Sequence, residues 1–141
     1  MKRLQPPDWA RPKGYANGVL AEGPFIFVAG QIGWNGQQEF ESDDIVDRVR
    51  QALENVCAIL REGGAGPEDI VRMTWYVEDK HAYSAATREI GEVYQEVIGA
   101  HYPAMTLFQV DSLLEDDAQV EIEVTAAAPV GSSDRGRCLD G

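Results

Sequence analysis

Two glutamates near the end of the sequence are the first side chains whose type and spacing could support catalysis. Glu121 and Glu123 lie two residues apart in the alternating run 120–124. On a β-strand this spacing puts both carboxylates on one face, about 6–7 Å apart. One of two such carboxylates can have a raised pKa, which suits it to move a proton to or from water or an imine nitrogen. A solvated strand face with ordinary surface charges explains the same spacing, and the pair alone favours that simpler interpretation.

Two loops are the other places where a small molecule could bind. Residues 30–34 read Gly-Gln-Ile-Gly-Trp, and residues 102–106 read Tyr-Pro-Ala-Met-Thr. The glycines lack the spacing of a dinucleotide-binding loop and do not open a helix, so they favour a turn over a phosphate site. His81 and His101 have no carboxylate or thiol at ligand spacing, so we expect two surface histidines and no metal site.

Seven predicted elements would position these residues, in the order strand, strand, helix, strand, helix, strand, strand. Helical periodicity favours one helix from Ser42 to about Gly63, capped by Ser42 or Asp43, and a second from about Tyr83 to Ile98. Short apolar and β-branched runs predict the strands at 19–21, 25–30, 70–77, 105–110 and 120–127. We therefore expect a single α/β (α+β) domain over residues 1–128, with a mixed sheet, two helices on one face, and a disordered polar tail over 129–141.

The predicted strands carry apolar residues at more positions than one buried face of a sheet can hold. Phe25 and Phe27 share one parity of their strand, while the neighbouring positions 26 and 28 are also apolar. Two helices can cover only one face of such a sheet. Self-association is the simplest way to bury the second face, so we expect an oligomer.

Composition narrows the class of function. The 141 residues carry 24 acidic and 12 basic side chains, a formal net charge of -12, so the average field repels nucleic acid. No apolar run reaches membrane-spanning length and the first residues lack a secretory pattern, so a cytoplasmic protein without membrane contact is expected. Cys57 lies in a helical pattern and Cys138 in the polar tail, which predicts one buried and one exposed thiol.

Five segments in this order and spacing together resemble one family. They are residues 27–32, 51–56, 67–71, 102–104 and 120–124, within a match from about Tyr15 to Ala128. The pattern resembles the RidA (YjgF/UK114, reactive intermediate deaminase) family. The resemblance implies a chorismate-mutase-like fold, a homotrimer with its sheets packed into a central barrel, and a small-molecule ligand in each cleft between subunits. Active members of the family hydrolyse enamines or imines to a keto acid and ammonia, without metal or cofactor.

The resemblance also assigns site residues, and here the sequence departs from the family pattern. Glu121 corresponds to the glutamate that positions the attacking water, Gly30 to a glycine whose backbone lines the site, and Tyr15 to a site tyrosine. The family's arginine, which binds the substrate carboxylate, is replaced by Met105, and a family cysteine is replaced by Leu107. A thioether cannot make the paired hydrogen bonds of a guanidinium, so small 2-imino acids should not be the best ligands.

Two cations could restore the positive charge of the missing arginine. Arg72 and Arg88 are the possible replacements, although the spacing favours solvated surface roles for both.

Three functions are compatible with these residues. The first function is hydrolysis of an enamine or imine of a less polar, larger or aromatic compound, with Glu121 ordering water. The second is a trimeric binding or regulatory module that keeps the cleft without catalysis. The third is the ribonuclease activity attributed to some relatives, which the acidic balance disfavours.

Overall fold

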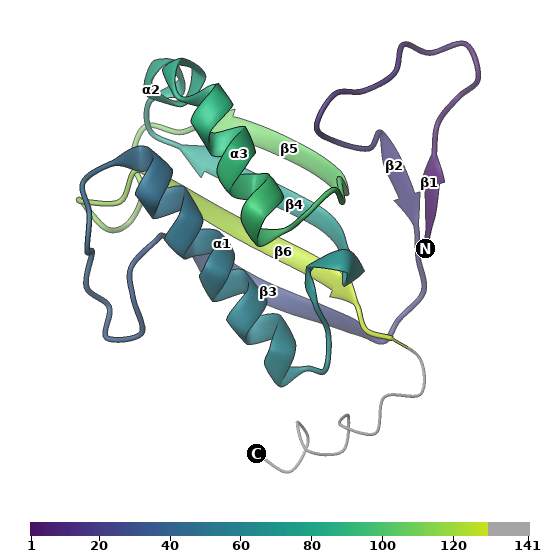
Figure 1. The fold of residues 1–141 in the computed structure, drawn as a ribbon, viewed down its shortest axis with the longest axis horizontal. Helices are drawn as coiled ribbons and strands as arrows, with labels where there is room; N and C mark the ends of the chain where they lie inside the picture. The colour runs from purple at the N-terminus through teal and green to yellow at the C-terminus, as the bar shows by residue number, and fades with distance from the viewer. Residues whose placement is uncertain (130–141) are drawn as a thin grey trace.

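The computed structural model describes residues 1–129 of the chain, and Figure 1 shows their arrangement. Cys138 and all of the predicted tail except Pro129 lie outside the described residues. The elements are β1 (Lys2–Leu4), β2 (Gly18–Leu20), β3 (Phe25–Gln31), α1 (Ile45–Glu62), a 3-10 turn (Pro67–Asp69), β4 (Ile70–Val77), α2 (Lys80–Ala85), α3 (Thr87–Val97), β5 (Ala104–Gln109) and β6 (Val120–Ala127).

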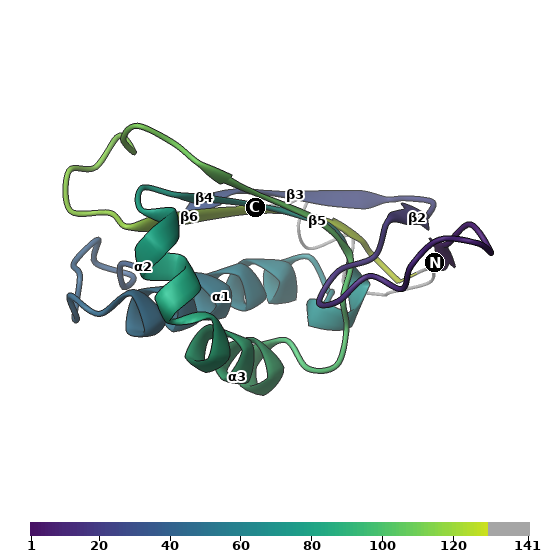
Figure 2. The same ribbon diagram turned by 90° about the horizontal axis from the view of Figure 1, so that it is seen from above.

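Four of the strands form one mixed sheet in the order β3-β6-β4-β5. The β3–β6 and β6–β4 pairs are antiparallel, and the β4–β5 pair is parallel. The three α-helices of residues 1–129 all lie on one face of this sheet, and Figure 2 shows none of them on the other face. The predicted fold class, a mixed sheet with helices on one face, is confirmed.

Helix α1 begins and ends close to where the periodicity predicts. Its cap is Asp44, whose side chain accepts a hydrogen bond from the Val46 amide, so the predicted caps Ser42 and Asp43 are wrong. The Ser42 hydroxyl instead accepts from the Asp44 amide and donates to Asp47, which draws the chain into the turn that precedes the helix. Gly63 ends the helix as predicted.

The second predicted helix is two helices, α2 and α3, separated at Ala86. The backbone of Ala86, at φ -107° and ψ 12°, leaves the helical region. Tyr83 before the break and Ile90 after it both pack on the same core, so the apolar periodicity continues through the break. Periodicity alone therefore could not locate it.

The N-terminal arm, residues 1–20, differs most from expectation. The predicted strand 19–21 does not pair with its neighbour across the 22–24 connection, because β2 pairs with β1 in a separate two-stranded sheet. The Ala16 amide donates to the Pro103 carbonyl at 2.9 Å, and Ala16 bridges Ala104. The arm therefore lies along β5, as Figure 1 shows, and carries Tyr15 to that edge of the sheet.

The core lies between the helices and the covered sheet face. Its strand side chains alternate with side chains that point to the other face, because successive residues of a strand face opposite ways. Cys57 belongs to this core, which confirms the prediction of a buried thiol, and burial raises the pKa of that thiol. The opposite face carries exposed aromatic side chains, among them Phe25, Phe108 and Phe27, the last 77% exposed.

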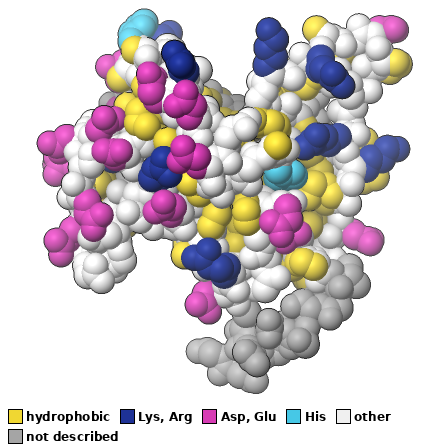
Figure 3. Space-filling model, in the orientation of Figure 1, with side chains coloured by type: hydrophobic (Ala, Val, Ile, Leu, Met, Phe, Trp, Pro, Cys, Tyr) yellow, Lys and Arg dark blue, Asp and Glu magenta, His cyan; other side chains and the backbone are white. Residues whose placement is uncertain are grey.

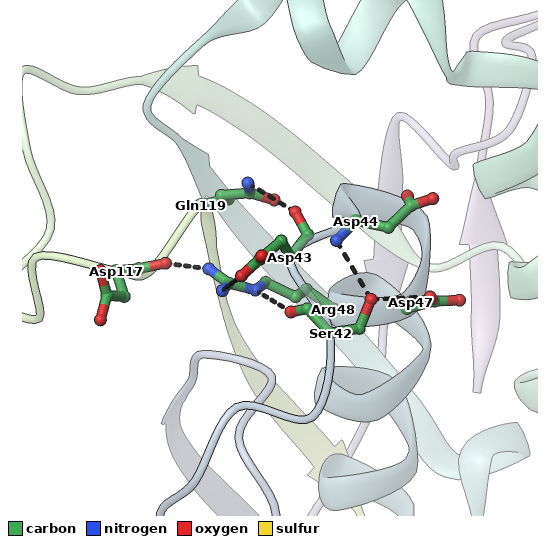
Figure 4. Close-up of polar contacts among 7 residues, drawn as sticks. All are labelled: Ser42, Asp43, Asp44, Asp47, Arg48, Asp117 and Gln119. Carbon is green, nitrogen blue, oxygen red and sulfur yellow. Dashed lines mark hydrogen bonds and ion pairs between the residues drawn. The ribbon is translucent and has the colours of Figure 1, made fainter.

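A buried arginine in α1 holds together the loops at one end of the sheet (Figure 4). Arg48 is only 4% exposed. Its Nε donates to the Ser42 carbonyl at 2.7 Å, its Nη1 donates to the Asp117 carbonyl, and its guanidinium lies 4.2 Å from the centre of the Phe40 ring. Asp43 lies 3.4 Å from its Nη2. One side chain thus joins the loop before α1 to the loop before β6.

A second contact ties the same loops directly to the strand that carries the catalytic candidate. Gln119 donates from Nε2 to the Asp43 carbonyl at 2.9 Å, one residue before β6 begins. Glu121 is the second residue of that strand. The start of β6, and with it the position of Glu121, is therefore held from the N-terminal end of α1.

Replacing Arg48 with leucine should destabilise the protein far more than the same change at an exposed arginine of the same helix. Arg48→Leu leaves the Ser42 and Asp117 carbonyls without their donor, and we expect the free energy of unfolding to fall by about 2–4 kcal/mol. The control Arg61→Leu, in the last turn of α1, should cost less than about 1 kcal/mol. Urea unfolding of both variants measures the difference, and equal small losses would show that Arg48 does not hold the loops.

Candidate functional site

Gly30 and Glu121, two of the predicted site residues, are in contact on the uncovered sheet face. The β3–β6 register shifts between Val28 and Gln31, which places Gly30 in an irregular stretch beside β6. A Cβ atom at Gly30 would lie 2.1 Å from Oε1 of Glu121. The Glu121 side chain therefore lies directly on the Gly30 backbone, in space that any larger residue would occupy.

The two glutamates of β6 have different surroundings on that face. Tyr76 lies opposite Glu121 in the β4–β6 register, but its hydroxyl donates to Oε1 of Glu123 at 2.7 Å. This hydrogen bond to Glu123 raises the pKa of Tyr76. Partial burial, together with the negative charge of Glu123, raises the pKa of Glu121. The raised pKa makes Glu121 a candidate for proton exchange.

Met105 and Leu107 lie on the opposite, helix-covered face of the sheet. In the parallel β4–β5 register Met105 is beside Met73 and Leu107 is beside Trp75. Both pack against the core formed with the helices, although each remains partly exposed because β5 is the edge of the sheet. Met105, the position that the resemblance assigns to the family's arginine, is therefore at the sheet edge, facing the helices.

A cavity of about 850 Å³ opens at this edge and is lined by Met105, Leu107 and Tyr15. It lies between α3, β5 and the N-terminal arm. Figure 3 shows the hollow between the α2–α3 side of the molecule and the arm, with basic side chains on both sides. The lining is strongly aromatic, with Trp75, Tyr83, Tyr94 and Tyr102. The structure thus brings three predicted site residues together in one cavity.

Sequence reasoning missed part of this cavity. Lys13, Gly91 and Tyr94 line it, and so does Arg88, whose side chain is 88% exposed, in agreement with the solvated surface role that was expected. Arg72, the other cation considered, lies on the uncovered face beside a shallow hollow with Tyr76. The helical periodicity around Ile90 and Tyr94 identifies core positions, but it does not show that the edge of this core is hollow.

The five predicted site residues therefore form two groups on opposite faces of one sheet. Glu121 and Gly30 lie on the uncovered face, while Tyr15, Met105 and Leu107 line the cavity on the helix side. Val120 and Ile122, which flank Glu121, are buried in the core against the helices. Within one chain the two groups cannot share a small ligand, because the packed sheet separates them.

Residues 1–129 hold neither a cluster of metal ligands nor a membrane-spanning helix. No group of three or more His, Cys, Asp and Glu side chains in this part of the chain is placed to hold a metal ion. No helix in it is long and apolar enough to cross a membrane. His101, expected at the surface, is half-buried, and its Nε2 lies 2.7 Å from the Ile70 carbonyl oxygen.

Comparison with known proteins identifies the family. The family described as Endoribonuclease L-PSP matches residues 9–128. A RutC family protein of Pyrococcus horikoshii is 35% identical over 117 residues, which are 82% of this chain and 89% of the relative. TdcF of Escherichia coli, whose name assigns it provisionally as a reactive intermediate deaminase, is 34% identical over 79% of this chain and 84% of its own length.

Solved structures agree with the sequence comparison. The Rid protein YyfB of Yersinia pestis, titled as a protein of unknown function, has a TM-score of 0.79 at 27% identity, covering 89% of this chain and 97% of its own. These matches agree with the fold, a mixed α+β sheet with its helices on one face, and with the Gly30–Glu121 contact. The chain belongs to the Endoribonuclease L-PSP family, which is the RidA/YjgF family that the sequence resembles.

The raised pKa of Glu121 makes a testable contribution to stability. A carboxyl whose pKa is higher in the folded than in the unfolded state binds more protons when folded, so its ionisation destabilises the fold as pH rises from its ordinary value of 4.5. Glu121→Gln removes this penalty. The stability of the variant relative to the parent should therefore increase between pH 4 and pH 7 in urea unfolding. A relative stability that is constant or falls over this range would contradict the raised pKa.

Proposed function

We propose that this protein hydrolyses the C=N bond of an imine, or of the imine tautomer of an enamine, with a substrate less polar than small 2-imino acids. The observation that carries the proposal is the Glu121 carboxylate, which has a raised pKa and lies on the Gly30 backbone. A carboxylate of this kind can take a proton from water and return it, because its pKa is closer to neutral pH. The family membership supports the same reaction class.

The proposed assembly is a homotrimer with a small-molecule ligand in each cleft between subunits. The uncovered sheet face supports it, because Phe25, Phe27 and Phe108 expose apolar surface there that association would bury. In this assembly the Glu121 face of one subunit meets the β5 edge of the next. The two groups of site residues then share one cleft, with Glu121 and Gly30 from one subunit and Tyr15, Met105 and Leu107 from its neighbour.

The proposed reaction consumes water and releases ammonia. Glu121 removes a proton from a water molecule while the oxygen attacks the imine carbon, and the C=N double bond becomes a single bond. The nitrogen gains two protons through Glu121, the first taken from the water and the second from the hydroxyl group of the tetrahedral intermediate, and the C–N bond breaks as the carbonyl group forms. The products are a carbonyl compound and ammonia, and Glu121 is again ionised. The absence of a side chain at Gly30 lets the Glu121 carboxylate lie against the backbone there.

Substrate choice in this proposal depends on Met105 and Leu107. A carboxylate placed against these two side chains would lose its water of solvation without gaining an ion partner. An apolar substituent placed there would be stabilised instead. This favours a compound larger and less polar than the imine of alanine.

A second candidate function is a non-catalytic binding or regulatory module with the same cleft. The specific observation that favours it is again Met105, since the residue that would fix a substrate carboxylate beside Glu121 has been exchanged. Such a module would gain thermal stability from a ligand without forming product.

One assay separates these functions. An amino acid oxidase generates the imine of alanine or of phenylalanine in the reaction mixture. The release of ammonia and of keto acid then measures the rate of imine hydrolysis. We expect the parent to accelerate hydrolysis of the phenylalanine imine and to act slowly or not at all on 2-iminopropanoate. Glu121→Gln should lower the rate by about 100-fold or more, because a general base contributes about that factor. Glu115→Gln, in the exposed turn before β6, is the matched control.

Met105→Arg completes the test in the same assay. A guanidinium at this edge can form paired hydrogen bonds with a carboxylate, so pyruvate should bind about tenfold or more tightly and 2-iminopropanoate should become a substrate. Thermal stabilisation by ligand with no product from any imine would support the binding module. Pyruvate binding by the parent as tight as by Met105→Arg would show that position 105 does not set the choice.

A further inference from the structure

The four strands of the mixed sheet carry four titratable side chains, and all of them lie on the uncovered face. Arg72 and Tyr76 belong to β4, Glu121 and Glu123 belong to β6, and β3 and β5 contribute none. Arg72 is exposed and forms no ion pair within residues 1–129. Within the sheet, the ionisation of Glu121 therefore depends on Glu123 and on the contact that holds Glu123 in place.

Apolar contacts fix the ring of Tyr76 on this face. The ring stacks on Phe108, with 6.1 Å between the centroids and an interplanar angle of 22°. It also packs against the buried cluster of Ile32, Leu113 and Ala118, which contains no titratable group. A ring packed in this way has little rotamer freedom, so its hydroxyl has a defined position.

The hydroxyl of Tyr76 passes its own register partner and reaches the next glutamate. Tyr76 is opposite Glu121 in the β4–β6 ladder, and Thr74 is opposite Glu123. The Tyr76 hydroxyl nevertheless donates to Oε1 of Glu123 at 2.7 Å. Glu123 is exposed, and an exposed glutamate without a partner has wide rotamer freedom. The hydrogen bond from a fixed ring therefore holds the Glu123 carboxylate beside β4, on the same face as Glu121.

The two carboxylates differ in what stabilises their charge. A hydrogen bond donated to a carboxylate favours its ionised form. Glu123 accepts such a bond, whereas no hydrogen bond or ion pair within residues 1–129 stabilises ionised Glu121. Glu121 is half-buried against Gly30, and the charge of Glu123 lies on the same face, so both effects raise the pKa of Glu121. The proton of the pair therefore belongs to Glu121.

We infer that Tyr76 is a positioning residue for proton exchange at Glu121. It holds Glu123 as an ionised and fixed neighbour, so that Glu121 is the carboxylate of the pair that takes the proton from water. Tyr76 acts through Glu123 in this role, and not on Glu121 directly. That the proton exchange is catalytic rests on the proposed function, whereas the difference between the two glutamates does not.

The first test observes the two carboxylates directly, in ¹³C spectra of the whole chain labelled at the glutamate Cδ. Glu121→Gln and Glu123→Gln assign the two signals, and Glu121 should titrate at the higher pH. Tyr76→Phe keeps the ring and its packing but removes the donor. The titration midpoint of Glu123 should then rise, and that of Glu121 should fall, because Glu123 is less often charged when Glu121 ionises. The signals of the other glutamates are the internal control, and midpoints identical to those of the parent would overturn the inference.

A double-variant cycle tests whether Tyr76 acts through Glu123. Glu123→Gln keeps an oxygen that can accept from the Tyr76 hydroxyl but removes the charge, so the midpoint of Glu121 should fall. Glu115→Gln, in the exposed turn before β6, is the matched control and should leave that midpoint unchanged. In the Glu123→Gln background, Tyr76→Phe should cause no further change at Glu121. A further shift in the double variant would show that Tyr76 acts on Glu121 directly, and would contradict the assigned role.

The hydrolysis assay with the phenylalanine imine adds a kinetic readout. In Tyr76→Phe the acidic limb of the pH profile of kcat/KM should move to lower pH, and kcat near neutral pH should fall about three- to tenfold with KM unchanged, because Glu121 becomes a weaker base. An unchanged pH profile together with a lower Tm would show that Tyr76 has a structural role only.

The two readouts separate this inference from the proposed function. The expected changes in the glutamate titrations, without hydrolysis of any imine by the parent, would support the role of Tyr76 and contradict the enzyme. Hydrolysis that depends on Glu121, with the same pH profile in the parent and in Tyr76→Phe, would support the enzyme and contradict the role of Tyr76.

Discussion

The constraint on which the rest of the structure depends is that three helices cover only one face of a four-stranded sheet. On the covered face the strand side chains form the core of the domain. On the other face, aromatic side chains such as Phe27 and Phe108 are exposed to solvent. Burial of apolar surface contributes about 25 cal/mol per Å², so a face of this kind favours association. The same alternation of side chains puts Glu121 on the exposed face and Met105 on the covered one.

This alternation is the reason that the proposed site is shared between subunits. Glu121 supplies a carboxylate with a raised pKa, and Gly30 supplies the backbone surface on which that carboxylate lies. The cavity on the other side supplies an aromatic lining and cations at its mouth. Neither half alone holds both a reactive group and a place for a ligand, so the proposed reaction requires that one subunit bring its exposed face to the β5 edge of another.

The sequence predicted the regular elements well where periodicity was strong. Strand β6 occupies the predicted residues 120–127, and β4 the predicted residues 70–77. Local patterns failed where long-range contacts decide the structure. The break at Ala86 leaves the apolar period intact, and β2 pairs with β1, a strand outside the predicted set.

Much of the candidate site was beyond sequence reasoning for the same reason. The resemblance to the family named Gly30 and Glu121, but their contact depends on a register shift between β3 and β6 that no local pattern encodes. Gly91 is an ordinary glycine in a helical pattern until α3 is placed beside β5 and the arm. The importance of Arg48 likewise depends on the Asp117 carbonyl, 69 residues away in the chain.

The most direct measurement of the shared site is chemical cross-linking between positions 105 and 121. A Met105→Cys/Glu121→Cys variant, with Cys138→Ser to remove the tail thiol, is treated with a short bis-thiol reagent and separated under denaturing conditions. A shared cleft predicts covalent dimers and trimers, none from either single cysteine variant, and a native mass by light scattering of three times that of the chain. Only monomeric bands, or a native monomer at micromolar concentration, would contradict it.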